Sequence, residues 1–286
     1  MSMKLSRRHF LLASAAAAGA TFFDVPRILA DTRDESLKKY GGFPMGIQSY
    51  SLRGLGVNGW EKAAELELHW VEFYSAHYQP TTDEKKVADM KARMDKLDIS
   101  ISAHGVHRFS KNHESNEQFF KFAKLAGFKN LSADPDPDAF DSLDKLCKQY
   151  DIRINIHSHG PGHRYDKITD VGKAIKDYDK RIGYCADLGH YIRSGEDPAK
   201  VIHEAGERLY GVHLKDFAEM KKNAKGTILG KGVMNVEEVF KALKKVKFPA
   251  DGALSLEYEE SAANPLPDIK ECLANAAAAA QKVAGA

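Results

Sequence analysis

The chain has 286 residues, of which 43% are hydrophobic and 29% are charged, a composition typical of a folded protein with one large domain. Residues 1–30 hold four basic residues and one acidic residue, so the remainder of a chain with net charge +2 lies near −1. A near-neutral body argues against a nucleic-acid partner, which usually needs a basic face. Three widely spaced cysteines exclude a disulfide framework and a paired-cysteine metal site.

The first element, residues 1–30, is predicted to be a targeting signal. Arg7 and Arg8 precede an uncharged, alanine-rich run from Ala13 to Phe23. Paired arginines before a short, weakly apolar stretch are typical of a twin-arginine signal peptide, and the run is too short to span a membrane well. We expect cleavage near Ala30, passage through the twin-arginine export machinery, no stable membrane anchor after processing, and a periplasmic or otherwise exported protein. A basic amphipathic helix of the folded domain is the alternative.

Residues 31–42 are predicted to be an N-terminal extension, and short apolar strands then alternate with amphipathic helices over residues 43–286. Helix-cap residues such as Thr81, Asp197 and Asn235 lie between the strands. Eight strand–helix units in about 240 residues predict an α/β fold, a single (β/α)8 TIM barrel. An open Rossmann-like sheet is the alternative, but no glycine-rich phosphate loop follows the first strand. The predicted strands cover residues 45–49, 70–74, 99–104, 130–133, 152–157, 182–187, 209–213 and 253–257.

Side chains alternate between the two faces of a strand, so the apolar positions identify the inward ones. This alternation turns four ligand-type residues inward at the carboxyl ends of consecutive strands: His157, Asp187, His213 and Glu257. Burying four such groups together is costly unless they are paired, so we expect them to bind one divalent metal ion. Two imidazoles and two carboxylates favour Zn, Mn, Co or Fe over Mg.

The same alternation turns polar residues inward at the ends of the first four strands. Gln48, Glu72 and His104 are therefore candidate substrate contacts, and Asp134 lies just beyond its strand. A single inward Glu or His is also common as a hydrogen-bonded structural residue, so that alternative stays open for Glu72 and His104.

The order and spacing of several short motifs resemble the xylose isomerase-like TIM barrel superfamily of sugar isomerases and epimerases, over roughly residues 43–283. The resemblance implies a metal held by Glu, Asp, His and Glu, which correspond here to His157, Asp187, His213 and Glu257. His157 is thus a departure from the usual Glu. The motifs include Val71-Glu72-Phe73, His157-Ser158-His159-Gly160, Asp187-Leu188-Gly189-His190, Val212-His213-Leu214-Lys215-Asp216 and Leu256-Glu257-Tyr258.

The resemblance further implies an enzyme that removes the proton next to a carbonyl of a sugar or keto-sugar. Glu257 and His159 are the candidate bases, and His159 has a role in the turn at Gly160 as its alternative. Lys215 is expected to balance the charge of an enediolate, or else to form a salt bridge. His190 is expected to reach a substrate hydroxyl, or else to orient Asp187.

Three functions stay open at this point. The first is an exported, metal-dependent sugar isomerase or epimerase. Because His157 removes one of the two carboxylate bases of the epimerases, a lyase or dehydratase that cleaves keto-glycosides or keto-sugars by β-elimination is the second. The third is a non-catalytic, exported sugar-binding barrel, which would not need four ligands. An apurinic endonuclease shares this barrel type, but the near-neutral charge argues against it.

Overall fold

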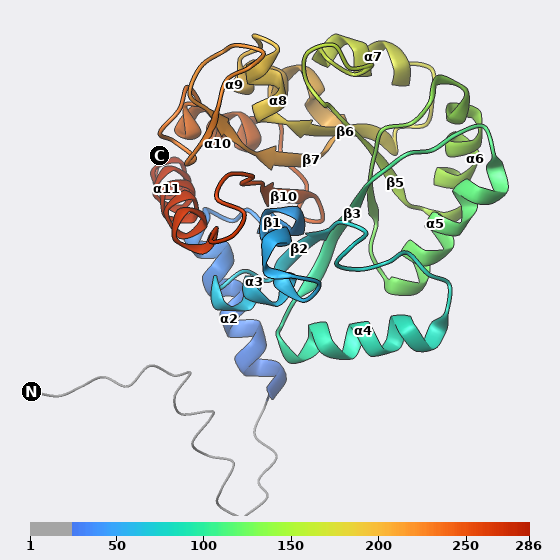
Figure 1. Cartoon of the computed structure of the whole chain (residues 1–286), viewed down its shortest axis with the longest axis horizontal. Helices are drawn as coiled ribbons and strands as arrows, with labels where there is room; N and C mark the ends of the chain where they lie inside the picture. The colour runs from blue at the N-terminus through green and yellow to red at the C-terminus, as the bar shows by residue number, and fades with distance from the viewer. Residues whose placement is uncertain (1–24) are drawn as a thin grey trace, which may run out of the picture.

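Eight parallel strands form a closed barrel at the centre of the computed structural model, which describes residues 25–286 (Figure 1). Each strand pairs with its neighbours in chain order, and the last closes the ring by pairing with the first. This confirms the predicted single (β/α)8 TIM barrel. The barrel strands are β1 (Met45–Gln48), β2 (Trp70–Phe73), β3 (Ser100–His107), β4 (Asn130–Ala133), β5 (Arg153–His157), β6 (Ile182–Asp187), β7 (Leu209–Leu214) and β10 (Ala253–Leu256).

Helices follow the strands and cover the outside of the barrel (Figure 1). Asp197 and Asn235 cap α9 and α10 as expected, whereas Asp83 rather than Thr81 caps α4. The α-helices are α2 (Val25–Lys39), α3 (Lys62–Glu65), α4 (Glu84–Lys96), α5 (His113–Ala126), α6 (Phe140–Tyr150), α7 (Ile168–Ile175), α8 (Leu188–Arg193), α9 (Pro198–Ala205), α10 (Val236–Lys245) and α11 (Leu266–Ala284). Short 3-10 helices are η2 (Ser49–Leu55), η3 (Gly59–Glu61), η4 (Pro137–Ala139) and η5 (Gly206–Arg208).

Alternation along the strands separates the hydrophobic core from the polar barrel interior. Ile154, Ile156 and Val212 are fully buried in the hydrophobic core. Between them, inward side chains reach the C-terminal rim, where Asp187 of β6 is paired in register with His213 of β7. The barrel therefore brings polar side chains from neighbouring strands to the same level of its interior.

The segment between β7 and α10 forms a hairpin that the sequence did not predict. Its strands are β8 (Asp216–Phe217) and β9 (Gly226–Thr227), which pair antiparallel. A side chain on Gly232 would collide with the backbone oxygen of Phe217, so the loop closes tightly there. The buried carboxylate of Asp216 holds the loop by accepting backbone N–H bonds of 2.8–3.1 Å from Phe217, Gly230, Gly232 and Met234.

Helix α2 is tied to the start of β3. The Nε atom of Arg33 donates to Asp98 Oδ1 at 2.7 Å, and its NH1 atom donates to Ser100 Oγ at 3.0 Å. The helix runs through residue 30, where we expect signal cleavage, whereas Arg7 and Arg8 lie outside the described residues. Within residues 25–286, no helix has the length and apolar character that a membrane span requires.

Candidate functional site

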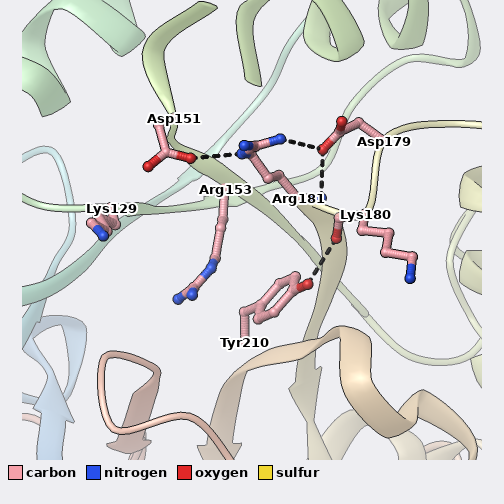
Figure 2. Close-up of a pocket in the computed structure, with 7 residues that line it drawn as sticks. All are labelled: Lys129, Asp151, Arg153, Asp179, Lys180, Arg181 and Tyr210. Carbon is pink, nitrogen blue, oxygen red and sulfur yellow. Dashed lines mark hydrogen bonds and ion pairs between the residues drawn. The ribbon is translucent and has the colours of Figure 1, made fainter. Parts of the chain in front are cut away.

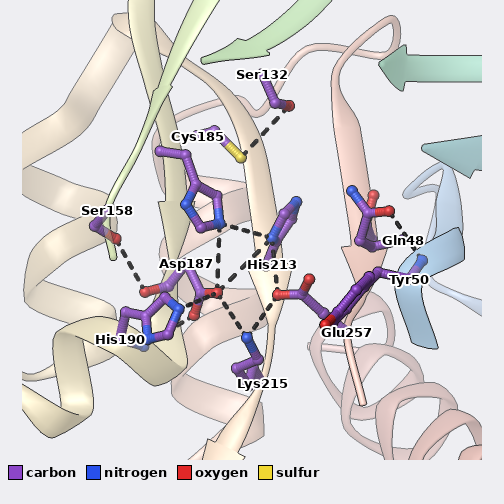
Figure 3. A network of polar contacts seen from close by, with 12 residues as sticks. Gln48, Tyr50, Ser132, Ser158, Cys185, Asp187, His190, His213, Lys215 and Glu257 are labelled. Atoms are coloured by element: carbon purple, nitrogen blue, oxygen red, sulfur yellow. Dashed lines mark hydrogen bonds and ion pairs between the residues drawn. The ribbon is translucent and has the colours of Figure 1, made fainter. Parts of the chain in front are cut away.

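The four predicted metal ligands lie together at the C-terminal rim of the barrel. His157 ends β5, Asp187 ends β6, His213 lies on β7 and Glu257 follows β10. Figure 3 shows Asp187, His213 and Glu257 pointing toward one another. All four side chains are buried, and their candidate ligand atoms lie within 4.8 Å of one another. The barrel therefore brings together residues that are up to 100 positions apart in the chain.

The spacing of these atoms fits a cage for a metal ion. His213 Nδ1 lies 3.1 Å from His157 Nε2, 3.2 Å from Glu257 Oε2 and 3.8 Å from Asp187 Oδ2. Ligand atoms bound tetrahedrally at about 2.1 Å from an ion lie about 3.4 Å from one another. Lone pairs at this spacing repel unless a proton or a cation lies between them. The residues present therefore fit a divalent metal ion.

Glu72 lies beneath His213 inside the barrel and has the hydrogen-bonded structural role that the sequence left open, while its contact with a substrate stays a prediction. Its carboxylate is fully buried, with Oε2 2.9 Å from His213 Nε2, and it accepts hydrogen bonds from Ser132 and Ser255 at 2.5 and 2.9 Å. Burial alone would raise the pKa of Glu72, but His213 and the hydroxyl donors lower it. A carboxylate that accepts the Nε2–H proton leaves the Nδ1 lone pair of His213 facing the cluster.

The surroundings of His213 favour its protonated form when no metal ion is bound. Burial would lower the pKa of this imidazole, but the surrounding acidic side chains, Glu72 and Glu257 among them, raise it well above its usual value. A proton on Nδ1 and a metal ion are therefore alternatives at the same position.

Lys215 adds a fixed positive charge beside the cluster (Figure 3). Its Nζ atom lies 2.7 Å from Glu257 Oε2, 3.2 Å from Asp187 Oδ2 and 3.1 Å from Glu259 Oε1. Burial would lower the pKa of Lys215, but the carboxylates raise it well above its usual value. The salt bridge that the sequence left open is present, and a role for Lys215 beside a developing negative charge stays a prediction.

Two further imidazoles lie next to the cluster. His190 Nε2 is 3.6 Å from Asp187 Oδ2, and its backbone N–H donates to Asp187 Oδ1 at 2.9 Å. The His159 ring lies 4.6 Å from the His157 ring, with Nε2 3.8 Å from Asp134 Oδ2. Burial lowers the pKa of His159 to about 3 and that of His190 to about 4. Both rings are therefore neutral at neutral pH, although burial also makes them weaker bases, and their catalytic and substrate-binding roles stay predictions.

His104 packs against the helix layer, so its predicted inward orientation is wrong, and its contact with a substrate stays a prediction. It is fully buried, its Nε2 lies 2.8 Å from the Tyr78 carbonyl oxygen, and its Nδ1 lies 2.8 Å from His107 Nε2. Its ring packs edge-on against Phe122 of α5. In the pairing of β2 with β3, one extra β3 residue lies between Ile101 and Ala103, which places His104 opposite Phe73 and reverses the expected alternation.

Gln48 lies at the end of β1, and its side chain caps η2. Its Oε1 atom accepts the Tyr50 N–H at 3.1 Å (Figure 3). The side chain is 2% exposed, and its contact with a substrate stays a prediction.

Sequence reasoning missed a cavity beside the cluster. The cavity has a volume of about 350 Å³, and Lys215 and Glu257 lie in its wall together with Arg193 and the hairpin loop. Arg193 follows His190 by three residues on α8, a spacing that places both side chains on one side of the helix. This spacing could have indicated from the sequence that Arg193 lies near the site.

A model of the family described as xylose isomerase-like TIM barrel matches residues 132–280. Among curated proteins, an inosose dehydratase of Clostridium botulinum is 28% identical over 140 residues, which are 43% of this chain and 47% of that protein. This chain therefore spans about half the length of the curated relatives that it matches.

Two solved structures share the fold. The apo form of 3-keto-D-glucoside 4-epimerase from E. coli superimposes with a TM-score of 0.65 at 13% identity, covering 82% of this chain and 98% of that one. The IOLI protein with a bound zinc atom superimposes with a TM-score of 0.59 at 13% identity, covering 84% of this chain and 96% of that one. At these identities the likeness concerns the fold alone.

Proposed function

The chain belongs to the xylose isomerase-like TIM barrel family, and on that premise we propose that it is a divalent-metal-dependent enzyme that removes the proton next to a carbonyl of a sugar or keto-sugar. The observation that carries this proposal is the buried convergence of His157, Asp187, His213 and Glu257 on one rim of the barrel. Neutral imidazoles beside that cluster supply a base.

The four side chains of the cluster would hold the metal ion, which supplies Lewis-acid polarisation of a carbonyl and a neighbouring hydroxyl. The chain's own residues do the rest. His159 accepts the proton, because its ring lies next to His157 and is neutral. Glu257 is the alternative base, but its carboxylate is bonded to Lys215. Lys215 then faces the negative charge that develops as the proton leaves.

β-Elimination is a second candidate for the step that follows. It is favoured by His157, which stands where epimerases of the family carry a carboxylate base, and by the likeness to an inosose dehydratase. In this reaction the base takes the proton, the C–H electrons form a C=C bond, and the leaving oxygen takes up a proton as its bond breaks. The protonated base is the candidate donor of that proton, because His190 is neutral. In the isomerase or epimerase reaction the proton is returned to carbon instead.

Deuterium exchange tests the proposed proton removal. Metal-loaded protein is incubated in heavy water with a panel of ketoses and 3-keto-glycosides, and deuterium at the carbon next to the carbonyl and elimination products are measured by mass spectrometry. The proposal expects exchange, elimination or both with one class of substrate. A metal-loaded protein that neither exchanges, isomerises nor eliminates any member would contradict it and favour a sugar-binding barrel.

We also propose export through the twin-arginine route, supported by Arg7 and Arg8 before the alanine-rich run. Changing both to Lys is expected to leave the protein in the cytoplasm. Cell fractionation measures this, and normal export of the double variant would contradict the proposal.

A further inference from the structure

The cavity beside the cluster is lined by charged residues of both signs. Arg193 of α8 and Lys222 and Lys225 of the hairpin loop supply positive charge, and the segment after β10 supplies Glu259 and Glu260. Glu259 is already paired with Lys215 at 3.1 Å. A ligand that fills this cavity therefore meets carboxylates near β10 and cations near α8.

Arg193 is held in place without an acidic partner. Its Nε atom donates to the Lys222 carbonyl oxygen at 2.9 Å, and its guanidinium lies 5.5 Å from the centre of the Phe217 ring. Its NH1 atom lies 3.3 Å from His190 Nδ1. Among residues 25–286, the ion pairs of the structure do not include Arg193. A guanidinium that is held in one position but has no carboxylate partner can bind an anionic group of a ligand.

Lys222 lies on the same side of the cavity. Its Nζ atom is 3.9 Å from the position that a Cβ atom would take on Gly162, so its side chain extends from the hairpin toward the loop after β5. Within the described part of the chain it has no carboxylate at ion-pair distance either. The hairpin that carries it is fixed by Asp216, which keeps Lys222 beside Arg193.

We propose that Arg193, assisted by Lys222, binds a carboxylate group of the substrate at the end away from the metal ligands. This rests on the proposed function and narrows it to sugar acids or glycosides that carry a carboxylate. The planar guanidinium matches the two oxygens of a carboxylate. Because Arg193 and Glu257 both line this cavity, a substrate whose carboxylate is bound by Arg193 can place its carbonyl at the cluster near Glu257.

Pairs of sugars that differ by one charge test this assignment. Metal-loaded protein is titrated calorimetrically with D-glucuronate and D-glucuronamide, with D-galacturonate and D-galacturonamide, and with glucose 6-phosphate. We expect each acid to bind about 10- to 100-fold more tightly than its amide, the effect of a hydrogen-bonded charge pair. Equal binding of acid and amide, or no binding of either acid up to about 10 mM, would overturn the proposal. Tighter binding of the phosphate than of both acids would reject the carboxylate assignment.

Two variants locate the effect. Arg193→Gln should bring the acid and amide to within about twofold of each other, and Lys222→Gln, on an exposed loop, should reduce the preference for the acid about threefold. Arg181→Gln, which changes an arginine at the opposite end of β6, should keep the wild-type preference. Metal content is measured in every sample. A wild-type protein that binds no metal contradicts the proposed function, whereas a metal-loaded protein whose preference survives Arg193→Gln contradicts only the carboxylate site.

Discussion

The two ends of the barrel carry similar charged residues in opposite arrangements. At the N-terminal end, a cavity has a volume of about 370 Å³. Arg181 bridges Asp151 and Asp179 in its wall (Figure 2), and the two contacts measure 2.8 and 3.0 Å. Arg153 is likewise bonded to Asp251 at 2.8 Å. Each of these two guanidiniums is paired with a carboxylate near solvent, so its charge is neutralised. Ion pairs of this kind contribute little to the free energy of unfolding.

At the C-terminal end the ionisable groups are buried. Nitrogen and oxygen atoms of His157, Asp187, His213 and Glu257 lie within 4.8 Å of one another there. His157 Nε2 and His213 Nδ1 lie 3.1 Å apart, a spacing that is stable only with a proton or a metal ion between the two nitrogens. Arg193, on the adjoining cavity, has no acidic partner in the described chain. Both ends carry many charges, but Arg193 at the C-terminal end lacks, within residues 25–286, the carboxylate partner that Arg153 and Arg181 have at the other end. Such an unpaired group, rather than the number of charges, indicates where a ligand binds.

The largest expected effect concerns the base. Changing His159 to Gln should lower turnover by about 10²- to 10⁴-fold while the metal stays bound, because general-base catalysis contributes about that much. Steady-state kinetics and elemental analysis of the same samples measure both. His163→Gln, on the same loop, is the matched control. If the His159→Gln protein stays active, His159 is not the base and Glu257 is the remaining candidate.

Glu72 provides the next test, because it separates a residue that orients a ligand from one that binds substrate. Glu72→Gln should weaken metal binding about 10- to 100-fold, as loss of a partner of a ligating imidazole does. Competition with a chelator measures the affinity, and nitrogen NMR of His213 reports its tautomer. Ser132→Ala, which removes only one donor to Glu72, should have a smaller effect. Unchanged metal affinity and tautomer in Glu72→Gln would show that Glu72 does not orient His213.

Asp216 tests whether the hairpin is fixed at the functional end. Asp216→Asn should lower the free energy of unfolding by about 1–3 kcal/mol, because an amide cannot accept four backbone N–H bonds. Urea unfolding measures the change, and limited proteolysis should show earlier cleavage within residues 217–234. Glu219→Gln on the same loop is the control, and identical unfolding and proteolysis of both variants would contradict this role.

The smallest effect is expected at the N-terminal end. Arg181→Gln should lower the free energy of unfolding by no more than about 1 kcal/mol and leave metal content and turnover unchanged, since Asp151 and Asp179 remain near solvent. Thermal unfolding and kinetics measure this. A large loss of activity in Arg181→Gln would contradict the assignment of function to the C-terminal end alone.

The sequence predicted the four ligand positions because β5, β6 and β7 keep a regular alternation up to the rim. The same rule failed at His104, because the pairing of β3 with β2 shifts register just before this residue. At Glu72 it predicted the correct side of the strand but not the depth, since alternation does not tell how far below the rim a side chain lies. The depth of a side chain in the barrel depends on how neighbouring strands are shifted along one another, and the sequence of one strand does not determine that shift.

The other omissions were residues outside the strands. Arg193 lies on a helix of six residues, and Asp216 starts a two-residue strand. Elements this short leave no periodic pattern in a sequence. Their partners, the Lys222 carbonyl and the backbone N–H groups of the hairpin, are defined only once the loop is folded.

The metal content of purified protein tests the central claim most directly. Elemental analysis should find about one transition-metal ion per chain in the wild type and in His203→Ala, which changes an exposed histidine of α9. His213→Ala should lose the ion. A wild-type protein without stoichiometric metal after incubation with zinc or manganese, or equal metal content in His213→Ala, would contradict the account.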